Sequence, residues 1–308
     1  MVSKVFNKIL IIGCNGFIGS HLVEQYKSAS HRVIGCDVCD SHSVDKYYIV
    51  DQLNPDYNQI FLENKFDLVI NASGSSNVNA SFINPFYDYN LNVQNAIKIL
   101  ETIRLFNSEC KYINLSSAAV YGNPKVLPIN EMAEISPQSP YANHKYLSEL
   151  VCKEYSMYYG LNTCNIRIFS AYGPGLKKQI FWDLYQKYKN IRKDHIELWG
   201  TGKESRDFIY IKDLVSAIHL CSLNSNFTGE IINIASGKEI FIKDAAETLI
   251  RFLDPTVKII FNGLTRKGDP INWNADIKQL RSFGFDPGYT LETGLKKYAD
   301  WLRDEIKS

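Results

Sequence analysis

Residues 8–19 read Lys8-Ile-Leu-Ile-Ile-Gly-Cys-Asn-Gly-Phe-Ile-Gly19, which is a short apolar run, three glycines and the start of an amphipathic pattern. The periodicity predicts a strand over Lys8–Ile12 and a helix over Phe17–Ser28. The three glycines then fall in the turn between them, where a dinucleotide pyrophosphate approaches the backbone and the helix N-terminus. A tight turn with close helix–strand packing would need the same glycines, so their position in the unit is what favours a dinucleotide site.

Further apolar runs follow along the first half of the chain, each separated from the next by a helical pattern. Strands that are almost wholly apolar and spaced by helices indicate a parallel sheet covered on both faces. We therefore predict an α/β fold, a doubly wound Rossmann architecture. The expected strands are Arg32–Cys36, Leu68–Ala72, Tyr112–Leu115 and Thr163–Phe169, and the expected helices are Asn90–Phe106 and Pro140–Tyr159.

The pattern changes after Tyr172-Gly-Pro-Gly175, where turn residues interrupt it. The later periodic segments are separated by loops rich in Gly, Asn, Lys and Asp. We expect a dinucleotide-binding Rossmann domain over residues 1–172, rejoined by about residues 208–236, and a smaller α/β substrate domain over residues 173–308. The later segments are Gln179–Tyr188, Ile209–Ser222, Glu230–Ile234 and Lys243–Leu253.

The composition excludes several classes of protein. With 34 Lys and Arg against 33 Asp and Glu, the net charge is +1, so no overall field would hold the chain on nucleic acid or on an anionic membrane. No run of eighteen apolar residues exists, and the apolar run Ile9 to Ile12 is too short for a signal-peptide core. Seven cysteines contain one close pair, Cys36 and Cys39, which cannot complete a zinc site alone. We expect a cytoplasmic protein with reduced thiols, and no metal, nucleic acid or membrane partner.

The second strand ends at Asp37, 24 positions after Gly13. A carboxylate near this spacing hydrogen-bonds the adenosine ribose hydroxyls in dinucleotide-binding units. It would repel a 2′-phosphate, and no arginine follows within residues 38–44, so NAD is favoured over NADP. The alternative is an ordinary aspartate that caps a turn at the end of a strand.

Tyr141-Ala-Asn-His-Lys145 places a phenol and an ammonium at i and i+4, on one face of the expected helix. A tyrosine of ordinary pKa, near 10, is a poor base at neutral pH, and Lys145 could stabilise its phenolate. The spacing alone is not specific, because two other Tyr and Lys pairs repeat it. Only the Tyr141 pair follows a core strand that ends in a serine pair, Ser116 and Ser117, which could share a substrate hydroxyl with the phenol.

Taken together, the glycine triplet, Asp37, the stretch Ser116-Ser-Ala-Ala-Val-Tyr-Gly122 and Tyr-x-x-x-Lys resemble the extended short-chain dehydrogenase/reductases, and among them the UDP-galactose 4-epimerase type. The resemblance runs over nearly the whole chain. It implies an NAD-dependent enzyme that oxidises and reduces a sugar carbon of a nucleotide-diphosphate sugar. It also implies a homodimer formed through the helices Asn90–Phe106 and Pro140–Tyr159.

The resemblance carries over residue roles. It implies Ser117, Tyr141 and Lys145 as catalytic residues, with Lys145 also holding the nicotinamide ribose. Without it, Arg206 and Arg266 would be read as surface residues. The implied cofactor residues are Gly13, Asn15, Gly16, Phe17, Ile18, Gly19, Asp37, Asp51, Gln52, Leu53, Ala72, Ser73, Gly74, Asn90, Tyr141, Lys145 and Phe169, and the implied substrate residues are Ser117, Ser170, Arg206, Arg266 and Asp269.

Departures from the family pattern narrow the chemistry. Relatives that dehydrate the sugar carry one or two acids just after the catalytic Ser or Thr, and those that epimerise beside the carbonyl carry a cysteine there. This chain has Ala118 and Ala119, which favours hydride transfer at one alcohol carbon. Ser170 stands where the epimerases usually have Asn beside the substrate diphosphate. Trp273 falls near a position where bulky residues exclude an N-acetyl group, which favours a sugar with a hydroxyl at C2.

The resulting prediction is epimerisation at C4 through a transient 4-keto sugar. A one-way 4-ketoreductase or 4-dehydrogenase acting on a deoxyhexose or a heptose would share every residue named. A non-catalytic NAD(H)-sensing protein would keep the glycines and Asp37, but it has no need of Ser117, Tyr141 and Lys145 together.

Overall fold

The computed structural model describes residues 6–39, 44–191, 194–264 and 270–307, and the side chains of residues 306 and 307 are left out of that description. Arg266 and Asp269 therefore lie outside the described residues. Within those ranges, no helix combines the length and the apolar character that crossing a bilayer requires.

The main feature is a seven-stranded parallel sheet with the strand order β10-β6-β5-β4-β1-β2-β3. The chain runs outward from β1 to one edge and then crosses to β4, so the order reverses between β1 and β4. In open α/β sheets this switch point is where ligands bind, outside the carboxyl ends of the strands. The strands are β1 (Lys8–Ile12), β2 (Arg32–Asp37), β3 (Lys46–Ile49), β4 (Leu68–Asn71), β5 (Lys111–Ser117), β6 (Asn162–Ile168) and β10 (Thr228–Ile234).

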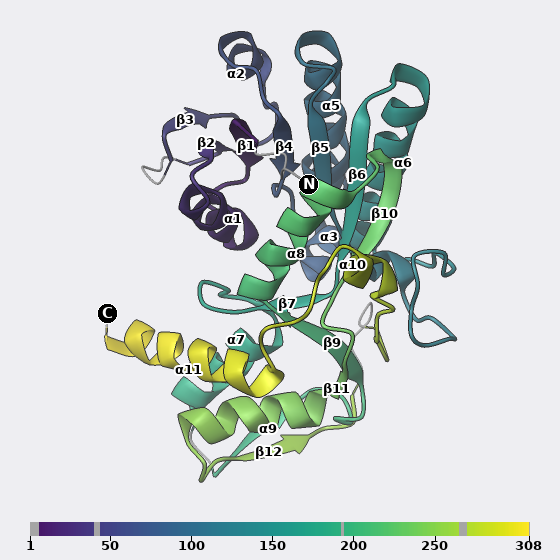
Figure 1. Ribbon diagram of the computed structural model, residues 1–308. Helices are drawn as coiled ribbons and strands as arrows, with labels where there is room; N and C mark the ends of the chain where they lie inside the picture. The colour runs from purple at the N-terminus through teal and green to yellow at the C-terminus, as the bar shows by residue number, and fades with distance from the viewer. Residues whose placement is uncertain (1–5, 40–43, 192–193, 265–269, 308) are drawn as a thin grey trace.

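The strands are apolar because both faces of the sheet are covered. In β1, Ile9 and Ile11 belong to one buried core, and Leu10 and Ile12 belong to the other. Helices α1 (Phe17–Ser28) and α8 (Ile211–Asn224) pack together on the first face (Figure 1). Helices α2 (Asn58–Glu63), α5 (Asn95–Phe106) and α6 (Pro140–Tyr159) contribute to the core on the second face. The predicted doubly wound α/β fold is confirmed.

Helix α6 has boundaries that the sequence sets by local chemistry. The Ser139 hydroxyl accepts a hydrogen bond from the Ala142 N–H at 3.1 Å, and Pro140 occupies the first turn, where its missing N–H costs nothing. Gly160 ends the helix in the left-handed conformation, with φ of 67°. These signals hold the segment that carries Tyr141 and Lys145 in a defined position.

The remaining elements lie mainly beyond the carboxyl ends of the sheet (Figure 1). A three-stranded sheet has the order β11-β9-β7, and a two-stranded parallel sheet joins β8 and β12. The division into two domains stays a prediction, although β10 does pair with β6 in the main sheet. The elements are β7 (Ser170–Tyr172), β8 (His195–Leu198), β9 (Ser205–Tyr210), β11 (Glu239–Phe241), β12 (Lys258–Phe261), α7 (Gln179–Lys189), α9 (Ile242–Leu253), α10 (Lys278–Ser282) and α11 (Leu291–Lys307).

Short helical segments complete the part around the sheet ends. They are α3 (Val78–Ile83), α4 (Pro85–Tyr89), the π-helical turn η1 (Asn90–Gln94) and the 3₁₀ turn η2 (Ala118–Tyr121). The helix expected over Asn90–Phe106 is therefore a π turn followed by α5. Such π turns are frequent at functional sites, because they change the direction in which the side chains of one turn point.

A buried ion pair connects the sheet to α6. Arg167 on β6 donates to both carboxylate oxygens of Glu149 on α6, at 2.9 and 2.7 Å, and each side chain is 2% exposed. The Ser116 hydroxyl on β5 donates to the same carboxylate at 2.5 Å, and Arg167 also donates to the Tyr121 hydroxyl at 2.9 Å. Buried charges are tolerated because every ionic group finds several polar partners.

Replacing Arg167 with Leu should lower the free energy of unfolding by about 3–5 kcal/mol, because the Glu149 carboxylate stays buried without its cation. Urea unfolding measures this change. Lys278→Ala is the matched control, since the Lys278 side chain of the Lys278–Asp276 pair is 89% exposed and such pairs contribute little. A loss below about 1 kcal/mol for Arg167→Leu would contradict the structural role given to the pair.

Candidate active site

The glycine-rich turn lies at the switch point between β1 and β4. Gly13 has φ of 81°, and a Cβ there would lie 2.7 Å from the Ser73 nitrogen and 2.8 Å from the Ala72 carbonyl. A Cβ on Gly19 would lie 2.0 Å from the Gly13 oxygen, because α1 packs directly on the turn. Gly13 is therefore required for its backbone conformation and for the close approach, and Gly19 for the close approach alone.

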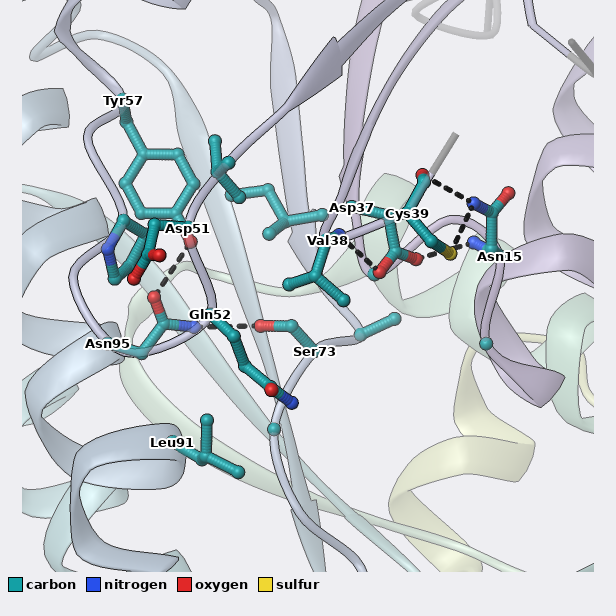
Figure 2. Close-up of a pocket in the computed structure, with 17 residues that line it drawn as sticks. Asn15, Asp37, Val38, Cys39, Asp51, Gln52, Tyr57, Ser73, Leu91 and Asn95 are labelled. Atoms are coloured by element: carbon teal, nitrogen blue, oxygen red, sulfur yellow. Dashed lines mark hydrogen bonds between the residues drawn. The ribbon is translucent and has the colours of Figure 1, made fainter. Parts of the chain in front are cut away.

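Asp37 lies at the end of β2, beside the glycine turn. Its two carboxylate oxygens accept hydrogen bonds from the N–H groups of Asn15 and Val38, both at 2.8 Å. The Asn15 amide donates in turn to the Cys39 carbonyl at 3.2 Å (Figure 2). It also donates to the Tyr47 hydroxyl at 2.9 Å. These contacts fix the carboxylate at the wall of a pocket while leaving its remaining lone pairs available to ribose hydroxyls.

The pocket has a volume of about 320 Å³, within the range of small-molecule sites. It lies at the carboxyl ends of β1, β2 and β4. Nine residues predicted from the sequence line it: Gly13, Asn15, Gly16, Asp37, Asp51, Gln52, Ala72, Ser73 and Gly74. The lining also contains Ile12, Val38, Cys39, Val50, Pro55, Tyr57, Leu91 and Asn95, which the sequence reasoning did not identify.

Tyr57 and Asn95 form a polar wall opposite Asp37 (Figure 2). The Tyr57 hydroxyl donates to the Asn95 amide oxygen at 2.7 Å, and the Asn95 amide nitrogen donates to the Ser73 hydroxyl at 2.9 Å. The two residues come from a loop and from α5, so no local spacing in the sequence links them. Only the three-dimensional pairing brings them to the pocket.

A dinucleotide fits this set of residues. The cradle at Gly74 is narrow, since a Cβ there would lie 2.6 Å from the Asn92 side-chain oxygen. That oxygen is buried and has no hydrogen-bond partner among the described residues. Close backbone approach, a carboxylate at the strand end and an unpaired buried acceptor together match a ligand with ribose hydroxyls and a pyrophosphate.

The other residues predicted for the cofactor lie around the pocket or beyond it. Phe17 and Ile18 begin α1, and Leu53 is 52% exposed beside Asp51, whose carboxylate accepts from the Leu53 N–H at 2.9 Å. Asn90 directly precedes Leu91 and is not among the lining residues. Phe169 is buried near Tyr121 and Trp273.

The predicted catalytic residues meet where β5 ends and α6 begins. Ser117 is the last residue of β5, and Tyr141 is the second residue of α6. Tyr141 and Lys145 are both 8% exposed. The Tyr141 N–H donates to the Ser81 hydroxyl at 3.1 Å, and the Lys145 ammonium donates to the Leu115 carbonyl at 3.1 Å.

Burial disfavours the charged form of both Tyr141 and Lys145. It raises the pKa of Tyr141 to about 12, while a hydrogen bond with the Ser117 side chain acts to lower that pKa and the Asp88 carboxylate acts to raise it. Burial lowers the pKa of Lys145 to about 8, against the opposing effect of Asp88 and Glu149. Lys145 is therefore still mainly an ammonium at pH 7, whereas the phenol needs further positive charge nearby before it can ionise.

The predicted substrate residues that the structure describes lie on neighbouring strands. Ser170 begins β7 and is half-buried, and β7 pairs with β9, which carries Arg206. The Arg206 guanidinium donates to the carbonyls of Ser205 and Ile271 at 2.8 and 3.2 Å and lies 5.6 Å from the centre of the Trp273 ring. Stacking and bonding of this kind hold a guanidinium in a fixed orientation.

Trp273 contacts both Arg206 and the segment that follows Ser117. Its indole N–H donates to the Gly122 carbonyl at 3.0 Å, and its ring meets the edge of Phe169 at a centroid distance of 5.8 Å. Gly122 follows the 3₁₀ turn that begins immediately after Ser117. A tryptophan fixed on both sides can limit the size of a group bound beside it. In the part of the chain that the structure describes, no three His, Cys, Asp or Glu side chains are grouped as metal ligands.

Comparison with known proteins identifies the family. The model of the NAD dependent epimerase/dehydratase family matches residues 9–235. The chain belongs to this family. Its cofactor is accordingly NAD, in agreement with the prediction from Asp37.

Proteins of similar sequence or structure match this chain over nearly its full length. A putative UDP-glucose 4-epimerase of Methanocaldococcus jannaschii is 30% identical over 97% of this chain and 100% of its own. The structure of a UDP-N-acetylglucosamine 4-epimerase from Methanobrevibacter ruminantium is 26% identical, with a TM-score of 0.85, and covers 97% of this chain and 99% of its own. A UDP-glucuronic acid 4-epimerase from Bacillus cereus, solved with UDP-glucuronic acid and NAD, is 25% identical, with a TM-score of 0.86 and the same coverage.

Asp37 should make the protein bind NAD far better than NADP, because a 2′-phosphate would face this carboxylate. Replacing Asp37 with Asn should lower the ratio of NAD affinity to NADP affinity by roughly tenfold or more, since the repulsion between the carboxylate and the 2′-phosphate disappears. Calorimetric titration with both dinucleotides measures the ratio. Asp244→Asn, which removes an exposed charge in the first turn of α9, is the control. Equal affinities of the unchanged protein for NAD and NADP would contradict the role given to Asp37.

Proposed function

We propose that the protein interconverts two C4 epimers of a UDP-sugar through a transient 4-keto sugar, using tightly held NAD. The observation that carries the proposal is the meeting of Ser117 and Tyr141 beside the dinucleotide pocket: Ser117 ends β5, Tyr141 begins α6 one helical turn before Lys145, and the Ser117 side chain acts to lower the pKa of the phenol. The names of the relatives support a UDP-sugar and a reaction at C4.

In this proposal Tyr141 is the acid–base group. As a phenolate it accepts the proton of the sugar C4 hydroxyl, and it returns that proton after the keto sugar has turned over in the site. Ser117 hydrogen-bonds both the phenol oxygen and the reacting hydroxyl, and so holds them within reach of each other. Bound NAD supplies the acceptor and donor of the hydride, and its positive ring is the further charge that phenolate formation requires.

The residues after Ser117 support an epimerase over a dehydratase. Ala118 is fully buried and Ala119 is partly buried, so neither position offers an acid or a thiol to the substrate. Elimination of water needs a second acid–base group, and so does proton removal beside the carbonyl. With Tyr141 as the acid–base group and alanines at positions 118 and 119, reversible oxidation of a single alcohol carbon is the chemistry that the residues support best.

We assign binding of the nucleotide-sugar substrate to Ser170, Arg206, Arg266 and Asp269. A guanidinium suits a diphosphate because its donors can bind two oxygens at once. Ser170 is shorter than the Asn common in epimerases, so we expect it to contact the diphosphate through water or to leave that contact to the arginines. The fixed Trp273 ring favours a sugar with a hydroxyl at C2 over one with an N-acetyl group.

We further propose a homodimer in the cytoplasm. Leu150, Met157 and Tyr158 form one exposed stripe on α6, with exposures of 42%, 62% and 70%, and Leu105 at the end of the neighbouring α5 is 56% exposed. Such a stripe suits a two-fold contact with the same helices of a second copy. All seven cysteines are free, which suits a reducing compartment.

Light scattering should give twice the mass of the chain at micromolar concentration, and a monomer would contradict the dimer.

Replacing Tyr141 with Phe should slow epimerisation by about 10²–10⁴-fold, because the ring still packs but the acid–base group is gone. NAD binding should stay near that of the unchanged protein. Tyr188→Phe on α7 is the control and should keep full activity. The measurement follows product stereochemistry and the absorbance of reduced nicotinamide over a panel of UDP-sugars, without added NAD. Activity that survives Tyr141→Phe would contradict the proposed mechanism.

A further inference from the structure

A lysine at the start of α7 reaches the loop that follows the dinucleotide pocket. Lys178 is the N-cap residue of α7, and its ammonium donates to the Ser76 hydroxyl at 2.6 Å. Ser76 belongs to the loop between β4 and α3, two positions after Gly74, which lines the pocket. The contact joins residues 102 positions apart, so no local spacing in the sequence reveals it.

The segment of residues 173–178 connects β7 to α7 and passes from the first turns of α1 to that loop. Gly175 lies against α1, because a Cβ there would be 3.7 Å from the Phe17 ring and 3.8 Å from the His21 ring. Lys178, three positions later, contacts the loop after β4. The segment therefore crosses the switch point between β1 and β4, where the glycine turn and the N-terminus of α1 can receive a pyrophosphate.

The two residues that precede Lys178 are fixed to a different element. The Leu176 carbonyl accepts a hydrogen bond from the Tyr298 hydroxyl at 2.7 Å, and the Lys177 ammonium pairs with the Glu305 carboxylate at 2.5 Å. Both partners belong to α11, so this helix holds the segment in place. Lys178 is the residue of the segment whose side chain contacts the loop after β4.

The Lys178 ammonium has no counter-ion within the described residues, and its hydrogen-bond partner Ser76 is neutral. The side chain is exposed overall, but the protein atoms around the ammonium partly desolvate it, which lowers the pKa of Lys178. An ammonium has three N–H donors, and the Ser76 hydroxyl accepts from one of them. A partly desolvated cation with donors to spare is stabilised by an anion bound at the same place.

The position of the loop indicates which anion this is. A dinucleotide has to run from Asp37, at the adenosine end of the site, to Tyr141, at the catalytic end. The loop after β4 connects the two ends: Gly74 lines the pocket, and the Ser81 hydroxyl on α3 accepts from the Tyr141 N–H at 3.1 Å. Ser76 lies between these two contacts along the chain. The diphosphate joins the two nucleosides of NAD, so it is the part of the cofactor expected at the middle of the site.

We propose that Lys178 is a cofactor-binding residue whose ammonium, oriented by the Ser76 hydroxyl, binds the diphosphate of NAD and slows release of the dinucleotide. The glycine turn and α1 offer backbone N–H groups, which carry partial charges, whereas Lys178 adds a full positive charge. The diphosphate of a nucleotide sugar has the same chemistry, so NAD and UDP are measured separately. A neutral tether between α7 and the loop is the competing explanation.

The experiment measures how fast the protein releases NAD. The protein is loaded with carbon-14-labelled NAD and mixed with excess unlabelled NAD, and the loss of label is followed at several salt concentrations. The affinity of the NAD-loaded protein for UDP is measured by calorimetric titration. Lys178→Met removes the charge, Lys178→Arg keeps it, and Ser76→Ala removes the hydroxyl alone. Lys189→Met is the matched control, because it removes the same charge from the last turn of the same helix.

Lys178→Met should release NAD about tenfold or more faster, because it loses a charge-assisted bond to the diphosphate. Lys178→Arg should stay within about threefold of the unchanged protein, since its charge is kept. Lys189→Met should change the rate by less than about twofold, as an exposed charge at the far end of α7. Salt should speed release from the unchanged protein more than from Lys178→Met, because ions screen the attraction that the variant lacks.

A neutral tether predicts a different pattern. Ser76→Ala would then speed release as much as Lys178→Met, and the two proteins would respond to salt alike; that pattern would overturn the proposal. NAD release from Lys178→Met at the rate of the unchanged protein would also overturn it. If Lys178→Met weakened UDP binding and left NAD release unchanged, the lysine would belong to the substrate instead. The readout needs no sugar, so loss of the proposed epimerase activity and loss of this inference are separate outcomes.

Discussion

The bidentate ion pair between Arg167 and Glu149 is the constraint on which the geometry of the active site depends. It is buried at the junction of β6 and α6, and the Ser116 hydroxyl on β5 completes it. Ser116 precedes Ser117, and Glu149 follows Lys145 by one helical turn. Helix α6 cannot slide along the sheet without leaving a charge unpaired in a medium of low dielectric, and that penalty fixes the phenol against the serine.

Within this fixed geometry, electrostatic interactions set which of the buried side chains are charged. Burial alone keeps Tyr141 neutral and lowers the pKa of Lys145 to about 8, so the protein by itself does not generate the base. In the proposed mechanism, ionisation of Tyr141 depends on the positive charge of the bound cofactor. Among the acids nearby, the charge of Glu149 is offset by its ion pair with Arg167. The base would thus be active only when the dinucleotide is in place, which suits an enzyme that must return the same hydride.

Local signals account for the parts of the fold that the sequence predicts well. Helices Phe17–Ser28 and Pro140–Tyr159 end where predicted, because glycines, a serine cap and a proline mark their limits. The short strands β3 and β7 and the helix α11 were not predicted. Strand β3 is half-buried, and β7 has three residues, so neither shows an apolar run. Strand β7 pairs with β9, and helix α11 packs on α9, so these two elements depend on partners distant in sequence.

The residues of the candidate site also fall into two sets, those that sequence motifs predict and those that they do not. Gly13, Asp37, Ser117, Tyr141 and Lys145 are recognisable because strand ends and helix turns bring short motifs to one edge of the sheet. Tyr57 and Asn95 in the cofactor pocket carry no motif. They reach the site through tertiary packing of a loop and α5. Sequence spacing alone cannot reveal contacts of that kind.

The central claim is that one bound cofactor carries a hydride away from C4 and returns it to the same carbon. The most direct test uses a UDP-sugar with deuterium at C4, incubated with the NAD-loaded protein and excess unlabelled NADH in solution. The account predicts that the epimerised product keeps its deuterium at C4, with none in the free NADH or in water. Loss of the label to either pool would contradict the account, because the hydride would then have left the site.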